Sequence, residues 1–380
     1  MAATTHTGPA ATPATTSAMP PEWAPHERTW MSFPTRNETF GGSGSSTLDR
    51  ARTAWASVAR TIARYEPVVV VAHPQDEAEA RRRLGSDAEV VTAALDDSWM
   101  RDSGPTFTLE ANGSLSAVNW VFNGWGAQSW SRWDHDQHLA TFVADHAQAP
   151  QRDSALVNEG GGFHIDGRGT VLLTETVQLD PQRNPGATRS AVETEIHAQL
   201  GTTHAVWLPR GLTRDYDGFG TKGHVDIVAS FTEAGTVLLH RQGDPRHPDH
   251  RVYRELRDVL DGAVDAEGHP LRVVDVPAPA ALRDDEGWLD YSYINHYVAN
   301  GAVILCSFGE PHADGEASEI LAAAYPGRVV ELVDARDIFA FGGGIHCITQ
   351  QQPRADLGRQ EARAQAQSDA QQQSGGGADV

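Results

Sequence analysis

The feature that most constrains the fold of this 380-residue chain is a recurring order of a helical segment followed by a short β-rich segment. Residues 48–66 carry apolar side chains at helical spacing and lead directly into the apolar run 67–73. The same order recurs at 187–201 with 203–210, at 250–264 with 271–277, and at 315–327 with 328–335. Helices that alternate with short apolar strands predict an α/β fold.

Five glycine-flanked polar motifs interrupt this pattern at intervals of 51 to 72 residues, and they are centred on Asp102, Glu159, His224, His296 and Cys347. Five units of similar length, each with strand-like segments and usually a helix, predict a closed five-bladed α/β propeller with pseudo-fivefold repeats. In such an array the strand ends of different units converge on one axis. Residues far apart in the sequence can therefore share a central site.

The two ends of the chain differ in composition from its middle. Residues 1–18 are mostly Ala, Thr and Pro, and residues 354–380 are rich in Gln, Ala and Gly. We expect both segments to be disordered, because they contain too few apolar side chains to join a core. No linker of domain-separating length lies between them, so we expect a single catalytic domain over residues 19–353.

Composition argues against several classes of partner. The chain has 51 acidic and 30 basic residues, for a formal net charge of −21, which disfavours nucleic acid and suits a cationic small molecule, although acidity also serves solubility. No signal peptide and no apolar run long enough for a membrane span is present, so we expect a cytoplasmic protein. The two cysteines lack the spacing of a disulfide framework or a cysteine zinc site.

Two motifs place reactive side chains beside glycines or beside each other. Cys347 follows three glycines, whose backbone allows close approach, and we expect it on a strand; a buried inert thiol is the alternative. Cys306 lies in an apolar run and is expected to pack in the core. His224 and Asp226 would face the same way on a strand and could address one ligand, or they could form a purely structural pair.

Two further acids have a less specific setting. On an extended segment Asp102 would point away from Arg101, and Glu159 precedes three glycines; either acid could instead serve a turn. A metal site is another alternative, and its ligands would be His164, Asp166, His224, Asp226 and Asp102. No compact ligand spacing supports that alternative, so we predict no metal site.

In combination these motifs resemble the agmatine deiminase family, which is similar to peptidyl-arginine deiminases. The resemblance extends over nearly the whole expected domain, and the segments that carry it are 19–34, 99–107, 121–126, 158–175, 182–188, 207–212, 223–231, 308–311 and 342–353. It implies the guanidine-modifying α/β-propeller (pentein) fold. It also implies an enzyme that hydrolyses a guanidinium group to a ureido group and ammonia, with neither a metal nor an organic cofactor in the reaction.

The resemblance assigns roles to individual residues. Cys347 would be the nucleophile and His224 the general acid and base. Asp102 and Asp226 would grip the guanidinium, whose fixed fork of N–H donors suits carboxylates, and Glu159 would be a further active-site acid.

Several neighbours are weaker candidates for the substrate pocket. Trp99 and Trp125 could stack on a flat cation, Trp130 less so, and the backbone at Gly344 could approach the substrate closely. We expect Arg101 to be the structural partner of an acid. Strand alternation would turn His346 to the face opposite Cys347, so His346 is not expected to be catalytic.

The substrate is the least constrained part of the prediction. Segments 34–44 and 213–226 differ from the pattern familiar in the family, and we expect them to contact the tail of the substrate. Agmatine is favoured; an arginine derivative, peptidyl-arginine or a specialised metabolite is the alternative. An amidinotransferase or a non-catalytic binding protein on the same fold are further alternatives. Similar enzymes often form dimers, so we allow for a homodimer.

Overall fold

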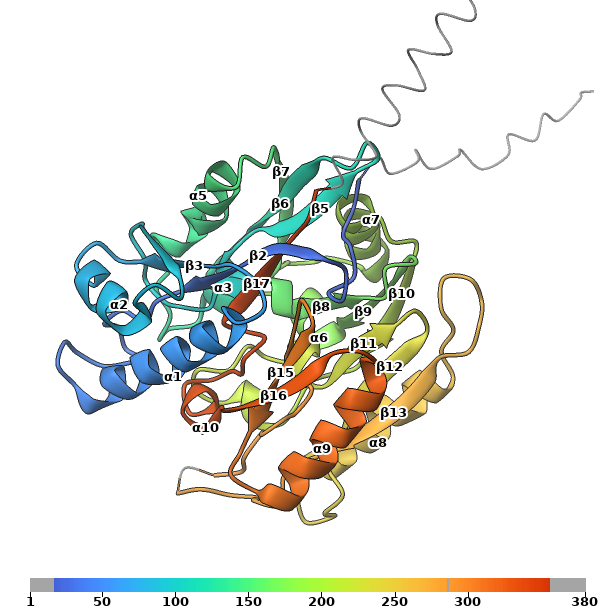
Figure 1. The fold of residues 1–380 in the computed structure, drawn as a ribbon. Helices are drawn as coiled ribbons and strands as arrows, with labels where there is room; N and C mark the ends of the chain where they lie inside the picture. Colours follow the sequence, from blue (N-terminus) through green and yellow to red (C-terminus); the bar gives the residue numbers. More distant parts are fainter. Residues whose placement is uncertain (1–16, 286, 356–380) are drawn as a thin grey trace, which may run out of the picture.

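The computed structural model describes residues 17–285 and 287–355, and Figure 1 shows their arrangement. The strands of this part of the chain form five separate sheets. The longer helices lie around the outside of the molecule in Figure 1, and the strands lie between them and the middle. The expected mixed α/β fold is therefore confirmed.

The five sheets share one pattern of connections. In each sheet an antiparallel pair of strands is followed by a helix and then by a third strand, which lies parallel to the second strand of the pair. Two of these units are β5 (Thr106–Glu110), β6 (Leu115–Val121), α5 (Leu139–His146) and β7 (Gln151–Val157), and β8 (Phe163–Ile165), β9 (Thr170–Thr174), α7 (Arg189–Leu200) and β10 (His204–Leu208). Two more are β11 (Ala229–Glu233), β12 (Thr236–Arg241), α8 (Asp249–Asp261) and β13 (Arg272–Pro277), and β14 (Tyr297–Ala299), β15 (Ala302–Ser307), α9 (Pro311–Ala324) and β16 (Val329–Asp334).

The remaining sheet joins the two ends of the described chain. Its antiparallel pair consists of β17 (Thr349–Pro353) and β2 (His26–Ser32), with Gln351 opposite Thr29. The elements that follow are α1 (Ser46–Ile62), β3 (Val68–Ala72), α2 (Glu77–Leu84) and β4 (Glu89–Thr92). Because β17 begins two residues after Cys347, this pairing anchors the C-terminal motif against the N-terminal one.

The segments with the clearest periodicity form the elements that the sequence predicts. The four helix-and-strand pairs become α1 with β3, α7 with β10, α8 with β13, and α9 with β16. Every residue of β3 is buried, as a continuous run of valines requires. The amphipathic and all-apolar patterns therefore indicated these elements correctly.

The ends of the chain depart from expectation in one respect. Ser17 and Ala18, which we expected in the N-terminal tail, form β1 and pair with Glu110 and Leu109 of β5. The polar sequence of 1–18 hid this strand, because β1 is held by backbone pairing rather than by apolar side chains. Residues 1–16 and 356–380, which carry the rest of the two expected tails, lie outside the described residues.

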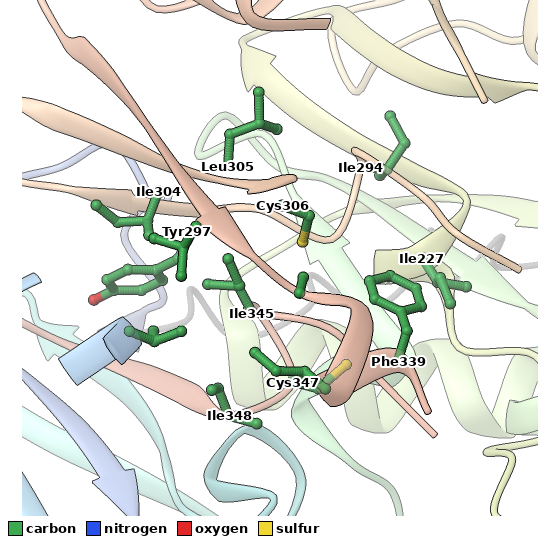
Figure 2. Close-up of a cluster of buried hydrophobic side chains, with 14 of the residues drawn as sticks. Ile227, Ile294, Tyr297, Ile304, Leu305, Cys306, Phe339, Ile345, Cys347 and Ile348 are labelled. Atoms are coloured by element: carbon green, nitrogen blue, oxygen red, sulfur yellow. The ribbon is translucent and has the colours of Figure 1, made fainter. Parts of the chain in front are cut away.

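The largest buried cluster surrounds β15 and the turn before β17. Figure 2 shows Cys306 among apolar side chains that include Ile304, Leu305 and Ile345. Burial raises the pKa of the Cys306 thiol to about 12, so this thiol stays protonated. The prediction that Cys306 packs in the core is confirmed. Among residues 17–285 and 287–355, no helix combines the length and the apolar character that a membrane crossing requires.

The packing of β1 against the end of α7 can be tested at Gly201, which has φ +73°, as does Gly186. A Cβ at Gly201 would lie 2.7 Å from the Ser17 carbonyl oxygen, whereas a Cβ at Gly186 would meet nothing within 4 Å. We expect Gly201→Ala to lower the free energy of unfolding by about 1–3 kcal/mol more than Gly186→Ala does, because only the first adds a clash to the backbone strain. Urea denaturation measures both, and equal losses would contradict this packing.

Candidate active site

The predicted site residues come from four separate parts of the fold. Asp102 lies in the short helix α3 (Met100–Ser103), and Glu159 lies between β7 and the 3₁₀ turn η2 (Gly160–Gly162). His224 immediately precedes the 3₁₀ turn η4 (Val225–Ile227), which contains Asp226, and Cys347 lies in the turn before β17. The prediction that these residues lie on extended strands is therefore wrong for Cys347, His224, Asp226 and Asp102. The glycines beside these motifs favour tight turns over extended pairing.

The Cys347 thiol lies among polar groups although its residue is buried. Its Sγ is 3.7 Å from Asp226 Oδ2 and 3.2 Å from Asn295 Nδ2. Burial raises the pKa of the thiol well above its usual value, and the charges of Asp226 and Asp102 raise it further. Without a bound cation, Cys347 is therefore held as the neutral thiol.

His224 lies between two carboxylates. Its Nε2 is 3.3 Å from Glu159 Oε2, and its Nδ1 is 3.8 Å from Asp102 Oδ1. Burial opposes a charge on the ring, but Asp102 and Glu159 outweigh it and raise the pKa of His224 to about 9. The ring is therefore an imidazolium near neutral pH and can give up a proton.

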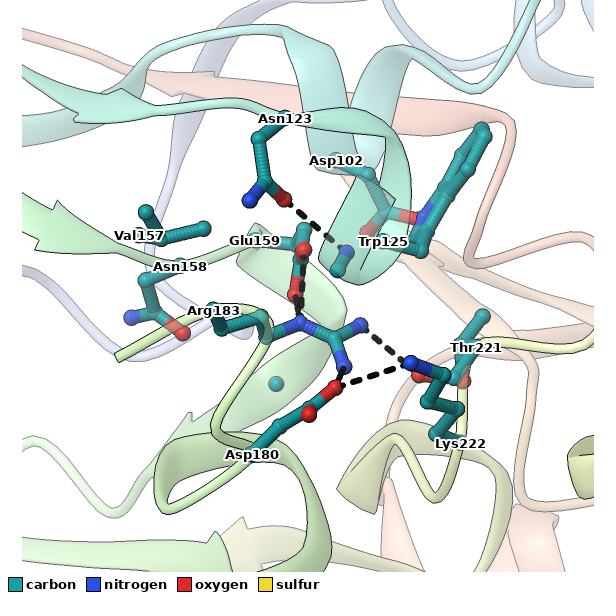
Figure 3. Close-up of polar contacts among 12 residues, drawn as sticks. Asp102, Asn123, Trp125, Val157, Asn158, Glu159, Asp180, Arg183, Thr221 and Lys222 are labelled. Atoms are coloured by element: carbon teal, nitrogen blue, oxygen red, sulfur yellow. Dashed lines mark hydrogen bonds and ion pairs between the residues drawn. The ribbon is translucent and has the colours of Figure 1, made fainter. Parts of the chain in front are cut away.

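Glu159 is neutralised by a cation that sequence reasoning did not single out. Arg183 donates from Nε to both Glu159 oxygens at 2.9 and 3.1 Å, and also contacts Asp180 and the carbonyl of Thr221 (Figure 3). Burial alone would raise the pKa of Glu159, but Arg183 and His224 lower it to about 2. Glu159 is thus a permanent acceptor for His224. Both of its oxygens, which could otherwise bind a substrate, already accept hydrogen bonds from Arg183.

From the described part of the chain, Asp102 receives two hydrogen bonds, and its only ion-pair partner there is His224. Trp125 Nε1 donates to its Oδ2 at 2.9 Å, and the backbone N–H of Gly161 donates to its Oδ1 at 3.1 Å. Burial raises the pKa of Asp102 to about 6, with further increases from Asp226 and Glu159. A Cβ at Gly161 would lie 2.5 Å from His224 Nδ1, so only glycine allows Asp102 and His224 to approach each other here.

Asp226 presents one free oxygen. Its Oδ2 accepts a 2.6 Å hydrogen bond from Nδ1 of His346, whereas its Oδ1 is buried and has no hydrogen-bond partner among residues 17–285 and 287–355. The expectation that His346 faces away from Cys347 is wrong, since both side chains contact Asp226 Oδ2. Strand alternation does not apply in the turn that carries these two residues.

The weaker candidates Trp99, Trp125 and Gly344 differ in what they contact. Trp99 is buried against Trp55, and a Cβ at Gly343 would lie 2.7 Å from the Trp99 ring. Trp125 stacks on Trp130 at 5.2 Å, so it belongs to an aromatic cluster and also bonds Asp102. The close approach at Gly344 is to Asn295, whose Oδ1 would lie 2.5 Å from an added Cβ.

The fourth polar motif contributes Asn295 instead of His296. The Asn295 amide contacts Cys347 Sγ, and its Oδ1 accepts from the backbone N–H of His346 at 3.0 Å. His296 points away and bonds Tyr325 at 3.0 Å, and burial lowers its pKa to about 4. This motif was centred on His296 because histidine is a common catalytic side chain, whereas the side chain at the site is the neighbouring amide of Asn295.

Arg101 and the alternative metal ligands lie elsewhere than expected. The hydrogen bonds of Arg101 go to the carbonyl oxygen of His346 and to Gln351, which are neutral, rather than to an acid. In the described part of the chain, the five residues of the alternative metal set do not gather within ligand distance of one another. His164 instead lies beside Glu22 and His346, and the Asp166 carboxylate accepts backbone N–H groups of its own turn.

Comparison with known proteins places this geometry in a family. The family model described as Porphyromonas-type peptidyl-arginine deiminase matches residues 18–353. The chain belongs to this family. A Streptomyces coelicolor protein with the provisional name agmatine deiminase is 60% identical over 340 residues, which are 89% of this chain and 99% of the relative.

Other relatives carry that name without qualification. The agmatine deiminase of Stutzerimonas stutzeri is 37% identical over 358 residues, with coverage of 88% of this chain and 95% of the relative. A solved structure titled as the agmatine deiminase of Enterococcus faecalis catalysing its reaction superimposes with a TM-score of 0.83 at 29% identity. That superposition covers 90% of this chain and 96% of the other.

The ion pair between Arg183 and Glu159 predicts a large effect on stability. Arg183→Met leaves the buried Glu159 charge without its cation, so we expect the free energy of unfolding to fall by about 3–5 kcal/mol. Lys222→Met is the matched control, because Lys222 bonds Asp180 in the same network but is partly exposed. We expect it to cost no more than about 1 kcal/mol. Chemical denaturation that finds equal losses would contradict the assignment.

Proposed function

We propose that this protein is an agmatine deiminase, which hydrolyses the guanidinium of agmatine to N-carbamoylputrescine and ammonia. The observation that carries this proposal is the meeting of Cys347, His224, Asp102 and Asp226 in one buried site. The names of the relatives support agmatine as the substrate, and they agree with a site built for a cation.

The carboxylates provide the binding step. Within residues 17–285 and 287–355, Asp226 Oδ1 is a buried acceptor without a hydrogen-bond partner, and Asp102 keeps acceptor capacity beyond its bonds from Trp125 and Gly161. A guanidinium that donates to both acids satisfies these groups and offsets their charge. Glu159, already paired with Arg183, orients His224 instead of binding the substrate.

The bound cation also activates the nucleophile. The pKa of Cys347 is raised by burial and by the charges of Asp226 and Asp102. A guanidinium between these acids offsets part of their charge, which lowers the pKa of the thiol and favours the thiolate. The thiolate attacks the guanidinium carbon and forms a C–S bond. His224 donates its proton to the departing nitrogen, and ammonia leaves with the electron pair of the broken C–N bond.

Hydrolysis completes the cycle. The neutral His224 takes a proton from water, and the hydroxide equivalent adds to the carbon of the thiouronium. The C–S bond then breaks, its electron pair returns to sulfur, and the hydroxyl proton of the adduct passes to that sulfur, so that the ureido product leaves and the Cys347 thiol is restored. The proton that Cys347 gave to solvent on substrate binding is taken up by the released ammonia, which becomes ammonium, and atoms and protons balance without any further reactant.

We also propose that the five sheets are the blades of a five-bladed α/β propeller within one catalytic domain. The shared connection pattern of the sheets supports this arrangement, as does the pairing of β17 with β2, which joins the two ends of the array. The four site segments each adjoin a different sheet. Convergence of blades on one axis accounts for a site assembled from such distant segments.

The substrate can be tested by direct assay. We expect purified protein to release ammonia and a ureido product from agmatine faster than from arginine or peptidyl-arginine. Cys347→Ala should abolish release, whereas Cys306→Ala, which changes the buried core thiol, should retain it. Undiminished release by Cys347→Ala would contradict the covalent route, and activity only on another guanidine would overturn agmatine while leaving the chemistry.

The site also predicts a bell-shaped pH profile of kcat/KM. Activity should fall below about pH 6 as Asp102 takes up a proton, and above about pH 9 as His224 loses one. Trp125→Phe removes a donor that favours the Asp102 carboxylate, so the acidic limb should move to higher pH. Trp120→Phe, which removes a buried donor to Thr106, is the control. An acidic limb unchanged by Trp125→Phe would contradict the assignment to Asp102.

A further inference from the structure

His346, the residue before the proposed nucleophile, is buried between two carboxylates. Its Nδ1 is 2.6 Å from Asp226 Oδ2, and its Nε2 is 2.9 Å from Glu22 Oε2. Glu22 lies 324 residues away in sequence, in the N-terminal motif 19–34, which the mechanism above does not use. The contact therefore connects an unassigned motif to the active site.

The positions of the two neighbouring carboxylates determine how many protons the His346 ring carries. A neutral imidazole has one N–H donor, whereas an imidazolium has two, and here both nitrogens face carboxylate oxygens. Burial and Arg101 oppose a charge on His346, but Glu22 and Asp226 outweigh them and raise its pKa. Burial likewise opposes ionisation of Glu22 and Asp226, yet the pKa of each acid is lowered, with His346 the main cause.

Glu22 is itself held in place from two other elements. The backbone N–H of Val298 in β14 donates to Glu22 Oε1 at 3.0 Å. His164 Nε2 lies 3.8 Å from Glu22 Oε2, and its Nδ1 accepts from the backbone N–H of Phe231 at 3.2 Å. Because Nδ1 of His164 is an acceptor, its proton lies on Nε2 and faces Glu22.

The same arrangement argues against a metal ion among Glu22, His164 and His346, although their ligand atoms lie within 4.8 Å of one another. A metal on His164 Nε2 would need an imidazolate, since Nδ1 already accepts a backbone hydrogen bond. Arg101, a permanent cation, lines the same small cavity. The three residues therefore form a hydrogen-bonded network rather than a metal centre.

We propose that Glu22 and His346 are a positioning pair that holds the Asp226 carboxylate charged and oriented for the guanidinium. This proposal rests on the proposed guanidine chemistry. Glu22 keeps His346 an imidazolium, and the imidazolium fixes Oδ2 of Asp226. Oδ1 of Asp226 is thereby presented to the ligand with no other partner in the described part of the chain.

The pair can be tested without turnover, by the protection of Cys347 against iodoacetamide. Millimolar guanidinium, the group shared by every candidate substrate, would lie against the sulfur of Cys347 and cover it, so it should slow alkylation of the peptide that contains Cys347 even though it favours the thiolate. Glu22→Gln removes one charged hydrogen bond from His346, so the concentration for half protection should rise about tenfold. An unchanged protection curve would overturn the proposal.

Matched variants separate positioning from stability. Glu66 is also a buried glutamate bonded to a histidine, His26, but this ring bonds the backbone carbonyl of Glu22 and not its carboxylate, so Glu66→Gln should leave protection unchanged. Glu22→Asp keeps the charge and should restore most of the affinity lost in Glu22→Gln. Alkylation of the core thiol Cys306 reports unfolding in every variant. Equal weakening by Glu22→Gln and Glu66→Gln, or no recovery in Glu22→Asp, would show a merely structural role.

A spectroscopic measurement on the wild-type protein tests the charge itself. With ¹⁵N in the histidine rings, His224 and His346 should each show both nitrogens protonated at pH 7, and one of these two signals should disappear in His346→Gln while that of His224 remains. A neutral ring at His346 would overturn the proposal. If agmatine is not hydrolysed but guanidinium still protects Cys347 in a Glu22-dependent way, the proposed substrate fails and the positioning pair stands.

Discussion

Three buried carboxylates surround His224 and Cys347, and the cost of keeping negative charges out of water governs the rest of the site. Each acid is compensated differently. Glu159 has Arg183, Asp226 has His346, and Asp102 has a tryptophan N–H and a backbone N–H together with His224. This unequal compensation separates the pKa values of the acids and gives each a distinct task.

The tasks follow from the compensation. Glu159, with a pKa of about 2, is always charged and keeps His224 protonated. Asp226 has one oxygen that accepts no hydrogen bond from the described residues, and Asp102, with a pKa of about 6, is the acid whose protonation responds most to the charge of a ligand. In the proposed function, a guanidinium that enters the site offsets the remaining negative charge and so favours the thiolate of Cys347. Substrate recognition and activation of the nucleophile would then be one electrostatic event.

The sequence predicted the regular elements and the main site residues, and the reasons differ. Helices such as α1 and strands such as β3 carry local apolar patterns, so their prediction needs no knowledge of the fold. The candidate site residues were predicted from several motifs together and from the family that these motifs resemble, because none of the motifs is specific alone; they are Cys347, His224, Asp102, Asp226 and Glu159. Their placement on strands was wrong, since the glycines that permit close approach also shape turns.

Other features had no local signal. Arg183 and Glu22 act on the site through contacts with Glu159 and His346, which lie 24 and 324 residues away. Asn295 was overlooked beside His296, because only the fold decides which neighbour faces Cys347. These partners compensate buried charge, and that need becomes visible only when the charges are placed in space.

The central claim is that carboxylates from distant segments hold a guanidinium against the sulfur of Cys347. The most direct measurement is the intact mass of protein quenched with acid during turnover of agmatine. The account predicts a species heavier by the mass of agmatine less ammonia, with the added mass on the peptide that contains Cys347. Product formation without such an adduct, or an adduct located on Cys306, would contradict it.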